Sequence, residues 1–532
     1  MSLNKKDLRE LPVGVQDFAA LRQDGMLYVD KTQRLLDLVR SGRRYFLSRP
    51  RRFGKSLTLS TLEAMFRGRS ELFTDLAAED WVKKQADSPY LVLRFDMSSL
   101  ASADKAALEQ SLKEMIARTA RKHGIILPSA SLSGMLIDLL EGLFAAGGPL
   151  VILIDEYDKP ILDSLTDAGK AEEIREILRV FYTTLKSCDG CLRFVFITGI
   201  SKFSKVGIFS ALNNLLDISL TENYSDITGY TQRELETNFS AWIDHTASNM
   251  RFSRTELLER MQSYYDGFSF DGKTKLYNPF SVLSFFATGE FHNFWYESGS
   301  PSFIVNWMRD HAIKDPEEYR HITVKSDFTA SQEIERADAS SFLFQSGYLT
   351  IEKKQDQLLI LDYPNREVLD SLSGMYLKLI YKVEGYASLG QEIWQALRRG
   401  NLEKTVQLYN TALAGIPYDD YLPNRHEFWY RSLFLMLLRG SGIIAYSEPH
   451  TSKGRADIVI QLDNTIIVLE FKFAPSSAEI ESKQREGILQ IQEKEYTKSY
   501  DAAAGCRVIA AVLVADGEKR HLTLHALTSG CC

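Results

Sequence analysis

Cysteine is scarce in this chain. Its 532 residues include five cysteines, which are Cys188, Cys191, Cys506, Cys531 and Cys532. Secreted scaffolds held by disulfides carry cysteine at a much higher density, so this class of protein is excluded. Cys188 and Cys191 have the gap of a zinc or redox pair, but no second pair follows at ligand spacing, so we interpret them as structural. The cysteine content favours a cytoplasmic protein.

Long apolar runs and an excess of positive charge are also missing. The first residues carry no apolar stretch of a signal peptide, and runs such as Leu433–Leu438 fall far short of the roughly 18 residues that span a bilayer. Lys+Arg 63 against Asp+Glu 70 gives a net charge of −7, which excludes a uniformly basic protein that coats DNA or membranes. We therefore expect no membrane partner, and any nucleic acid must bind at a local patch.

The length and the hydrophobic pattern instead predict a globular α/β protein with several domains. A chain of 532 residues has room for three to four domains of about 150 residues. Residues 44 to 220 alternate short apolar runs with long helical stretches, which predicts a parallel sheet with crossover helices. The candidate strands are Arg44–Ser48, Tyr90–Asp96, Leu150–Asp155, Arg193–Thr198 and Leu215–Leu220.

The strand signal fades after about residue 235 and returns near the C-terminus. Ala339–Phe344 reads as a helix, and Tyr348–Lys353 with Gln357–Tyr363 follow it at hairpin spacing, which suggests a winged-helix-like element near 339–363. The last 110 or so residues read as helix, strand, hairpin, helix, strand and strand. We predict an α/β domain over 1–235, a helical middle over 236–415 and a second α/β domain over 416–532.

The first candidate site follows the strand that ends at Ser48. Gly54, Lys55 and Ser56 match the end of the phosphate-binding pattern G-x-x-x-x-G-K-[ST], and the helical stretch Leu57–Phe66 follows them. In such a loop the backbone N–H groups face the phosphates, the lysine reaches the β and γ oxygens, and the hydroxyl holds Mg²⁺. Arg49 stands where the pattern has its first glycine.

Two later strand ends supply partners for this loop. Leu150–Asp155 is an apolar run that ends in Asp155 and Glu156, which suits Asp155 to position Mg²⁺ and Glu156 to activate the attacking water. Thr198 ends another strand, where a hydroxyl would sense the γ-phosphate. The alternative is a core strand that ends in solvated acids. Together with the loop, the acids favour a nucleoside triphosphate site.

Arginines gather around the same loop. We assign Arg49 and Arg52 to nucleotide binding, because guanidinium groups suit phosphate oxygens. The alternative is that they are solvated cations that offset nearby acids. The full cluster is Arg43, Arg44, Arg49, Arg51 and Arg52.

The second candidate site lies near the C-terminus. Ile458–Ile460 and Thr465–Phe473 read as a hairpin with a turn at Asp463 and Asn464. Glu470 and Lys472 share one face of the second strand, and Asp457 opens the first strand, where it comes beside Glu470. Asp457 and Glu470 can hold Mg²⁺, and Lys472 can orient or help deprotonate water and stabilise charge on a phosphate. The alternative is an edge strand with a charged face.

These motifs together resemble one known family, the bacterial AAA-ATPase-like proteins with a C-terminal PD-(D/E)XK nuclease domain. The resemblance spans nearly the whole chain, and in that family the missing first glycine of the loop is the rule. It implies an additional-strand P-loop ATPase, whose sheet has the order 5-1-4-3-2. The segments that carry it are Tyr28–Thr32, Arg49–Ser56, Leu153–Asp158, Phe196–Ile200, Tyr277–Phe280 and Tyr363–Val368, with Asp457, Glu470 and Lys472.

The resemblance also implies further site residues. Glu427, which follows His426 at the start of an apolar helix, can add a metal ligand, although a surface-helix residue is the alternative. Gln490, Lys494 and Tyr496 resemble the helix that approaches the site and the DNA backbone, although a solvated helix face is the alternative.

The resemblance predicts an enzyme with ATP and Mg²⁺ as cofactors and with nucleic acid, in the first place DNA, as its partner. Since additional-strand ATPases often complete their sites between subunits, a homo-oligomer is also expected. The predicted function is an ATP-hydrolysing protein coupled to DNA cleavage, with defence against phage or mobile elements as a further hypothesis. The rivals are a nucleotide-gated switch whose nuclease is dormant until triggered and a non-catalytic nucleic-acid-binding module.

Overall fold

The chain divides into two compact units. The first consists of Met1–His311 and Arg320–Glu367, and the second of Ala312–Tyr319 and Val368–Cys532. The computed structural model describes residues 8–165, 167–202, 215–297, 316–329, 338–381, 383, 385–416, 427–447, 455–462, 465–501 and 507–527. His426, Asp463, Asn464 and the C-terminal cysteines lie outside these ranges. The predicted domain boundaries at 235 and 415 stay a prediction.

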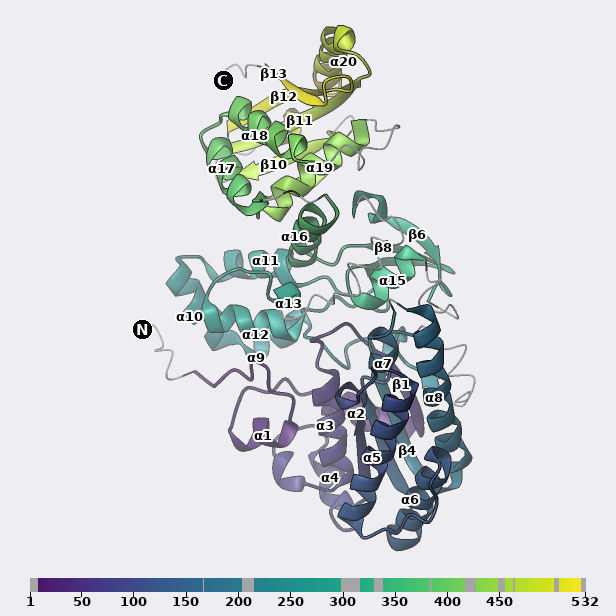
Figure 1. Ribbon diagram of the computed structural model, residues 1–532. Helices are drawn as coiled ribbons and strands as arrows, with labels where there is room; N and C mark the ends of the chain where they lie inside the picture. Colours follow the sequence, from purple (N-terminus) through teal and green to yellow (C-terminus); the bar gives the residue numbers. More distant parts are fainter. Residues whose placement is uncertain are drawn as a thin grey trace. The chain divides into compact units, whose positions relative to one another are not determined.

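A parallel five-stranded sheet forms the centre of the first unit (Figure 1). Its order is β2-β3-β4-β1-β5, which confirms the predicted order 5-1-4-3-2. β1 lies between β4 and β5, with Ser48 opposite Gly199, so the loop after β1 emerges beside the end of β4. The strands are β1 (Arg44–Ser48), β2 (Val92–Asp96), β3 (Leu150–Asp155), β4 (Leu192–Gly199) and β5 (Leu216–Asp217).

Helices cover both faces of this sheet because side chains alternate along each strand. Ile152 and Ile154 pack under α5, α6 and α8, whereas Val151 and Leu153 pack under α2, α3 and α4. All six residues of β3 are buried, as expected for a central parallel strand. The helices of this part are α1 (Phe18–Gln23), α2 (Thr32–Ser41), α3 (Lys55–Phe66), α4 (Glu79–Gln85), α5 (Lys105–His123), α6 (Leu132–Gly147), α7 (Lys159–Leu162) and α8 (Ala168–Ser187).

A helical region rich in aromatic residues follows the sheet. Its core contains Phe239, Trp242, Tyr265, Phe285 and Phe286, with stacked or tilted ring pairs. A capping box at Thr231 and Glu234 starts its first helix. The helices are α9 (Gln232–Asn238), α10 (Ser240–Met250), α11 (Arg254–Tyr265), α12 (Pro279–Thr288) and α13 (Phe294–Glu297).

The predicted helix and hairpin near 339–363 are present in the first unit. α15 (Ala339–Ser346) precedes β7 (Thr350–Gln355) and β8 (Leu358–Asp362), which pair as antiparallel strands. β6 (Ile322–Lys325) adds a third strand that pairs with β8, giving the order β6-β8-β7. The sequence pattern did not identify β6, because only two of its four side chains are even partly covered.

The second unit contains a mixed five-stranded sheet in the order β13-β12-β11-β10-β9. β11 and β12 are parallel and the other neighbours are antiparallel, so the predicted helix, strand, hairpin, helix, strand, strand pattern is confirmed. The strands are β9 (Ala445–Ser447), β10 (Ile458–Leu462), β11 (Thr465–Ala474), β12 (Arg507–Asp516) and β13 (His521–Leu527). The helices are α17 (Tyr386–Arg398), α18 (Leu402–Ala414), α19 (Glu427–Gly440), α20 (Ile480–Glu493) and α21 (Lys498–Asp501), and α16 (Arg366–Met375) crosses from the first unit into the second.

The two faces of β11 meet different helices. Phe471 and Phe473 contact aromatic side chains of α19, whereas Val468 belongs to a core that includes Ile491 of α20. Glu470 and Lys472 alternate with the phenylalanines, so they share the face of Val468, as the period of two predicts. This arrangement buries two charged side chains on the face of β11 that carries Val468.

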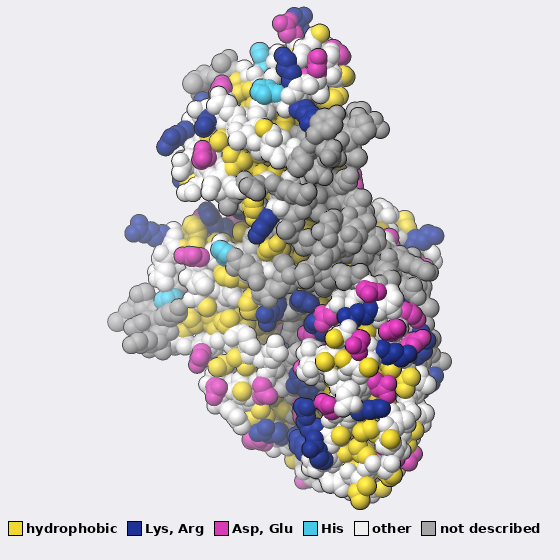
Figure 2. Space-filling model, in the orientation of Figure 1, with side chains coloured by type: hydrophobic (Ala, Val, Ile, Leu, Met, Phe, Trp, Pro, Cys, Tyr) yellow, Lys and Arg dark blue, Asp and Glu magenta, His cyan; other side chains and the backbone are white. Residues whose placement is uncertain are grey.

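The charged surface is mixed in the view that Figure 2 gives. Lys and Arg side chains are interspersed with Asp and Glu over the part of the first unit that faces the reader. This part of the surface is therefore not uniformly basic. Among the described helices, none is both long and apolar enough to cross a membrane.

Candidate functional site

The loop after β1 has the backbone of a phosphate-binding loop. Gly54 adopts a φ of 86°, a left-handed conformation that favours glycine, and directly precedes α3. No atom lies within 4 Å of where a Cβ would stand on Gly54, so backbone strain alone makes glycine the suitable residue. The first N–H groups of α3, beginning at Lys55 and Ser56, lack intrahelical partners and can face an anion.

Lys55 lies inside this loop. Its Nζ donates to the carbonyl oxygens of Arg49 at 2.9 Å and Pro50 at 3.0 Å. Burial lowers the pKa of Lys55, and the negative charges of Glu156 and Asp155 act in the opposite direction. The lysine predicted for the β and γ phosphates therefore lies near the acids predicted for Mg²⁺ and water.

Arg49 has a different position from the one predicted. Its guanidinium is buried, stacks 3.9 Å from the ring centre of Phe270, and donates to the carbonyl oxygens of Ser48, Ser219, Tyr224 and Ser225. Because these carbonyls take up both terminal nitrogens, the contacts do not support Arg49 as a phosphate ligand. It ties the start of the loop to the segment after β5.

The predicted acids and hydroxyl meet where β3 and β4 end. Thr198 Oγ1 donates to Asp155 Oδ1 at 2.9 Å, and Arg94 contacts Asp155 Oδ2 at 3.4 Å. Burial raises the pKa of Glu156, which has a φ of 47°. A carboxyl group with a raised pKa beside a lysine suits proton transfer from water.

Two residues that sequence reasoning passed over hold these strand ends together. Asp158 Oδ2 accepts from the backbone of Ile200 at 3.0 Å and from Ser201 N and Oγ, both at 2.7 Å. Tyr157 donates its hydroxyl proton to the Ser201 carbonyl oxygen at 2.6 Å. Both lie in the Leu153–Asp158 segment. The signal that could have identified them is that polar side chains follow directly after an apolar strand.

A cavity of about 330 Å³ opens beside the loop. Of the predicted residues, Arg52, Gly54, Lys55, Ser56 and Glu156 line it, whereas Arg49, Asp155 and Thr198 are not among its lining residues. Arg52 also lies 4.8 Å from the ring centre of Phe280. The lining residues that sequence reasoning missed are Pro12, Gly14, Val15, Gln16, Leu57, Lys159, Tyr230 and Leu283, whereas Arg51 was named within the arginine cluster and Pro279 and Phe280 within the Tyr277–Phe280 motif.

In the second unit, Asp457 lies next to Glu470. Ile458 of β10 pairs with Leu469 of β11, which sets Asp457 opposite Glu470. Asp457 Oδ2 accepts a 2.7 Å hydrogen bond from the backbone N–H of Phe471. This bond fixes the carboxylate at the edge of the hairpin.

Glu470 and Lys472 form a buried pair. Lys472 Nζ donates to Glu470 Oε1 at 2.7 Å, and Glu470 is 1% exposed. Glu470 Oε2 is buried with no hydrogen-bond partner among the described atoms. Burial and the charge of Asp457 raise the pKa of Glu470 to about 8. An unpartnered buried carboxylate oxygen beside a second acid fits a hard cation such as Mg²⁺.

Glu427 lies within electrostatic reach of this group. Burial raises its pKa, the positive charge of Lys472 lowers it, and Asp457 raises it further. Arg431, one turn later on α19, donates to Asp457 Oδ1 at 2.7 Å. The sequence reasoning missed Arg431, although its spacing of four residues from Glu427 was a signal.

The residues predicted to approach nucleic acid are only partly brought together. Gln490 Nε2 donates to the Tyr496 hydroxyl at 3.1 Å. Burial raises the pKa of Tyr496, and the charges of Glu470 and Asp457 raise it further, so Tyr496 lies within electrostatic reach of the acids. Lys494 is exposed at the end of α20, and its contact with a nucleic-acid backbone stays a prediction.

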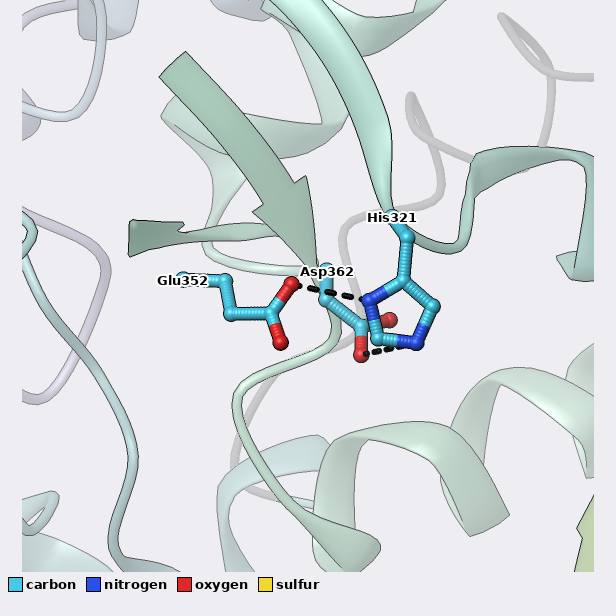
Figure 3. Close-up of side chains that lie close together, drawn as sticks. All are labelled: His321, Glu352 and Asp362. Carbon is cyan, nitrogen blue, oxygen red and sulfur yellow. Dashed lines mark hydrogen bonds and ion pairs between the residues drawn. The ribbon is translucent and has the colours of Figure 1, made fainter. Parts of the chain in front are cut away.

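A third group of titratable residues lies beside β8 in the first unit (Figure 3). His321 Nδ1 lies 2.8 Å from Glu352 Oε2, while its Nε2 lies 3.6 Å from Asp362 Oδ2. Each acid therefore contacts a different nitrogen of the ring, whereas a single metal ion would bind only one of the two nitrogens. Asp362 also accepts from Arg320 at 3.1 Å and 3.0 Å through both of its oxygens. We interpret the group as an ion-pair network.

Comparisons with known proteins match the two regions of the chain that contain these sites. A family described as predicted AAA-ATPase matches residues 12–209, and the PD-(D/E)XK nuclease superfamily matches residues 425–523. The chain is 34% identical over 508 residues to an uncharacterized protein in the vnfD 5′ region of Azotobacter chroococcum mcd 1, covering 93% of this chain and 94% of that one.

Two solved structures are also among the matches. The ORC2 protein of Aeropyrum pernix, in ADPNP-ADP complexes, is 11% identical with a TM-score of 0.26, covering 68% of this chain and 92% of that one. The ORC1 protein of the same organism, in complex with DNA, is 10% identical with a TM-score of 0.23, covering 88% and 93%.

Proposed function

Since the chain belongs to the family of predicted AAA-ATPases that carry a C-terminal PD-(D/E)XK nuclease domain, we propose that it couples ATP hydrolysis to Mg²⁺-dependent cleavage of DNA. The two matched families imply the use of a nucleotide and of a divalent metal. The observation that carries the proposal is the buried Glu470 oxygen that has no partner among the described residues, beside Asp457 and Lys472.

At the first site, the proposal assigns the triphosphate to the loop before α3. The N–H groups of Lys55 and Ser56 would face the phosphates, Lys55 Nζ would exchange its two loop carbonyls for phosphate oxygens, and the Ser56 hydroxyl with Asp155 would hold Mg²⁺. Glu156 lines the same cavity and would accept the proton of the attacking water. Thr198 would orient Asp155 through its hydrogen bond.

At the second site, Asp457, Glu470 and Glu427 would be the oxygen ligands. A bound divalent cation supplies Lewis-acid polarisation of the phosphate and a water of lowered pKa. Lys472 holds Glu470 Oε1 and would stabilise the charge that develops on the scissile phosphate. Gln490 would contact the nucleic-acid strand beside it, and Tyr496, which is buried, would orient Gln490 through the hydroxyl that accepts from its amide.

The proposal is tested by a cleavage assay with the purified full chain. Duplex, single-stranded and branched DNA, and RNA, are each incubated with and without ATP and Mg²⁺. We expect Mg²⁺-dependent cleavage of at least one DNA form that is lost in Asp457→Asn and Glu470→Gln. Cleavage that persists in both variants, or that needs no divalent metal, would reject the nuclease assignment.

The same assay separates the rival functions. Cleavage with ATP alone supports a constitutive ATP-driven nuclease, whereas cleavage that starts only after adding phage DNA or an infected-cell extract supports a triggered defence switch. Binding of nucleic acid without cleavage across a full metal titration would support a non-catalytic module.

A further inference from the structure

Arg431 contacts one of the two oxygens of Asp457. Its Nη1 lies 2.7 Å from Asp457 Oδ1, and the two side chains are 12% and 14% exposed. The other oxygen, Oδ2, accepts from the backbone N–H of Phe471 at 2.7 Å. Of the two oxygens, Oδ2 is therefore committed to the hairpin, and Oδ1 is the one through which the acid can exchange partners.

The guanidinium of Arg431 is held in place from a second side. It lies 5.3 Å from the ring centre of Phe428, which is itself 39% exposed. Arg431 therefore stands between a partly buried acid and an aromatic ring at the surface. A short change of rotamer would let a group that approaches from solvent bind the guanidinium in place of Asp457.

The acids of the site outnumber its basic side chains, so the site can accept one further cation. Lys472 already pairs with Glu470, and Arg431 pairs with Asp457, while Glu427 supplies a third acid. A divalent cation and a guanidinium both bind carboxylate oxygen and repel each other at this range. A phosphodiester carries negative charge and oxygens that match the planar fork of arginine.

We propose that Arg431 makes divalent-cation binding at Asp457 depend on nucleic acid. The guanidinium competes with the cation for Asp457 Oδ1 until a backbone phosphate of the substrate takes the guanidinium over. Metal and nucleic acid then bind cooperatively, because each favours the same arrangement of Arg431. The inference rests on the proposed nuclease function, since it needs Asp457 to be a metal ligand.

The test measures Mn²⁺ binding to the full chain by electron paramagnetic resonance of free Mn²⁺. Binding is recorded without nucleic acid and with a DNA duplex whose phosphorothioate linkages resist cleavage. The Asp457→Asn variant supplies the background, so that only binding that needs Asp457 is counted. Arg485→Gln is the matched control, because Arg485 is exposed on α20 and pairs with Glu481.

The expected effects of Arg431→Gln have opposite signs. Removing a charge-assisted hydrogen bond to Asp457 should tighten Mn²⁺ binding without DNA by about tenfold. The duplex should then no longer increase Mn²⁺ affinity, and cleavage of an unmodified duplex should slow. A residue with a merely structural role would lower metal affinity and cleavage together.

Arg431→Lys keeps the test decisive if the glutamine variant does not fold. Lysine retains the positive charge but lacks the two-pronged fork, so Mn²⁺ should still bind weakly without DNA, and the gain on adding duplex should shrink. A lysine variant with the full wild-type gain overturns the inference.

The outcomes distinguish this inference from the proposed function. Unchanged or weaker Mn²⁺ binding in Arg431→Gln, with binding still abolished by Asp457→Asn, rejects the role of Arg431 and leaves the metal site intact. If Asp457→Asn leaves Mn²⁺ binding unchanged, both when introduced alone and when combined with Arg431→Gln, the metal site is rejected. The inference is then rejected as well, because it needs that site.

Discussion

Nη1 of Arg49 donates a 2.7 Å hydrogen bond to the carbonyl oxygen of Ser219. The bond joins the first position of the phosphate loop to the segment after β5, at the position where the general loop pattern has a glycine. A glycine there could supply no side chain to the carbonyls that Arg49 contacts. The arginine that replaces this glycine therefore holds the loop against the segment after β5.

Arg49→Gly would complete the general loop pattern, yet we expect it to destabilise the first unit. Loss of the buried guanidinium leaves the carbonyls of Ser48, Ser219, Tyr224 and Ser225 without this donor, at a cost of roughly 3 to 5 kcal/mol. Chemical denaturation measures the change in the free energy of unfolding. Arg52→Ala is the control, since Arg52 lines the cavity and its loss should weaken ATP binding more than stability.

Lys55→Ala and Glu156→Gln should affect ATP differently. The first removes the charge that would face the phosphates, so both binding and turnover should fall, with turnover reduced about 100-fold or more. The second keeps the shape of the side chain but removes the base, so ATP should still bind while hydrolysis stops. Nucleotide binding and phosphate release measure the two steps. Wild-type turnover in Lys55→Ala contradicts the assignment of this loop.

Asp457→Asn should stop cleavage in the second unit without changing ATP turnover in the first. The amide cannot supply the anionic ligand, although its oxygen can still accept from the N–H of Phe471, so folding should be retained. Cleavage and ATP hydrolysis are measured on the same preparation. A parallel loss of both activities would mean that the two sites are obligately linked.

Glu367 should make the stability of the first unit depend on pH. Burial raises its pKa from 4.5 to about 8, and it accepts from Trp295 N at 2.8 Å and from Ser281 Oγ at 2.8 Å. Because the folded pKa is above the unfolded one, the stabilisation is complete below pH 4.5 and is lost as the pH rises to 8, by up to about 1.4 kcal/mol per pH unit.

The substitution Glu367→Gln tests this dependence, because glutamine stays neutral and its oxygen can accept the same bonds. In thermal unfolding from pH 5 to 9, the melting temperature of the variant should rise relative to that of the wild type as the pH increases. Glu259→Gln, at an exposed position of α11, is the control and should follow the wild type. Parallel curves for Glu367→Gln and wild type would contradict the prediction.

The sequence itself determined much of the framework, because local patterns carry it. The apolar run Leu150–Asp155 predicted a buried strand with acids at its end, and Gly54, Lys55 and Ser56 predicted the loop before α3. The period of two along β11 predicted that Glu470 and Lys472 share one face. Each of these features depends on neighbours within a few residues, so periodicity and backbone preference suffice to identify it.

Only the tertiary structure decided which side chains meet. Arg49 finds three of its four carbonyls 170 to 176 residues later, where the sequence suggested a phosphate ligand. Pro12, Gly14, Val15, Gln16 and Phe280 line the same cavity, and Arg431 reaches Asp457 across 26 residues. These contacts follow from how packed helices and strands bring distant segments together, and no short pattern records that packing. The physical reason is that a side chain's partner is set by the whole fold, whereas its conformation is set by its neighbours.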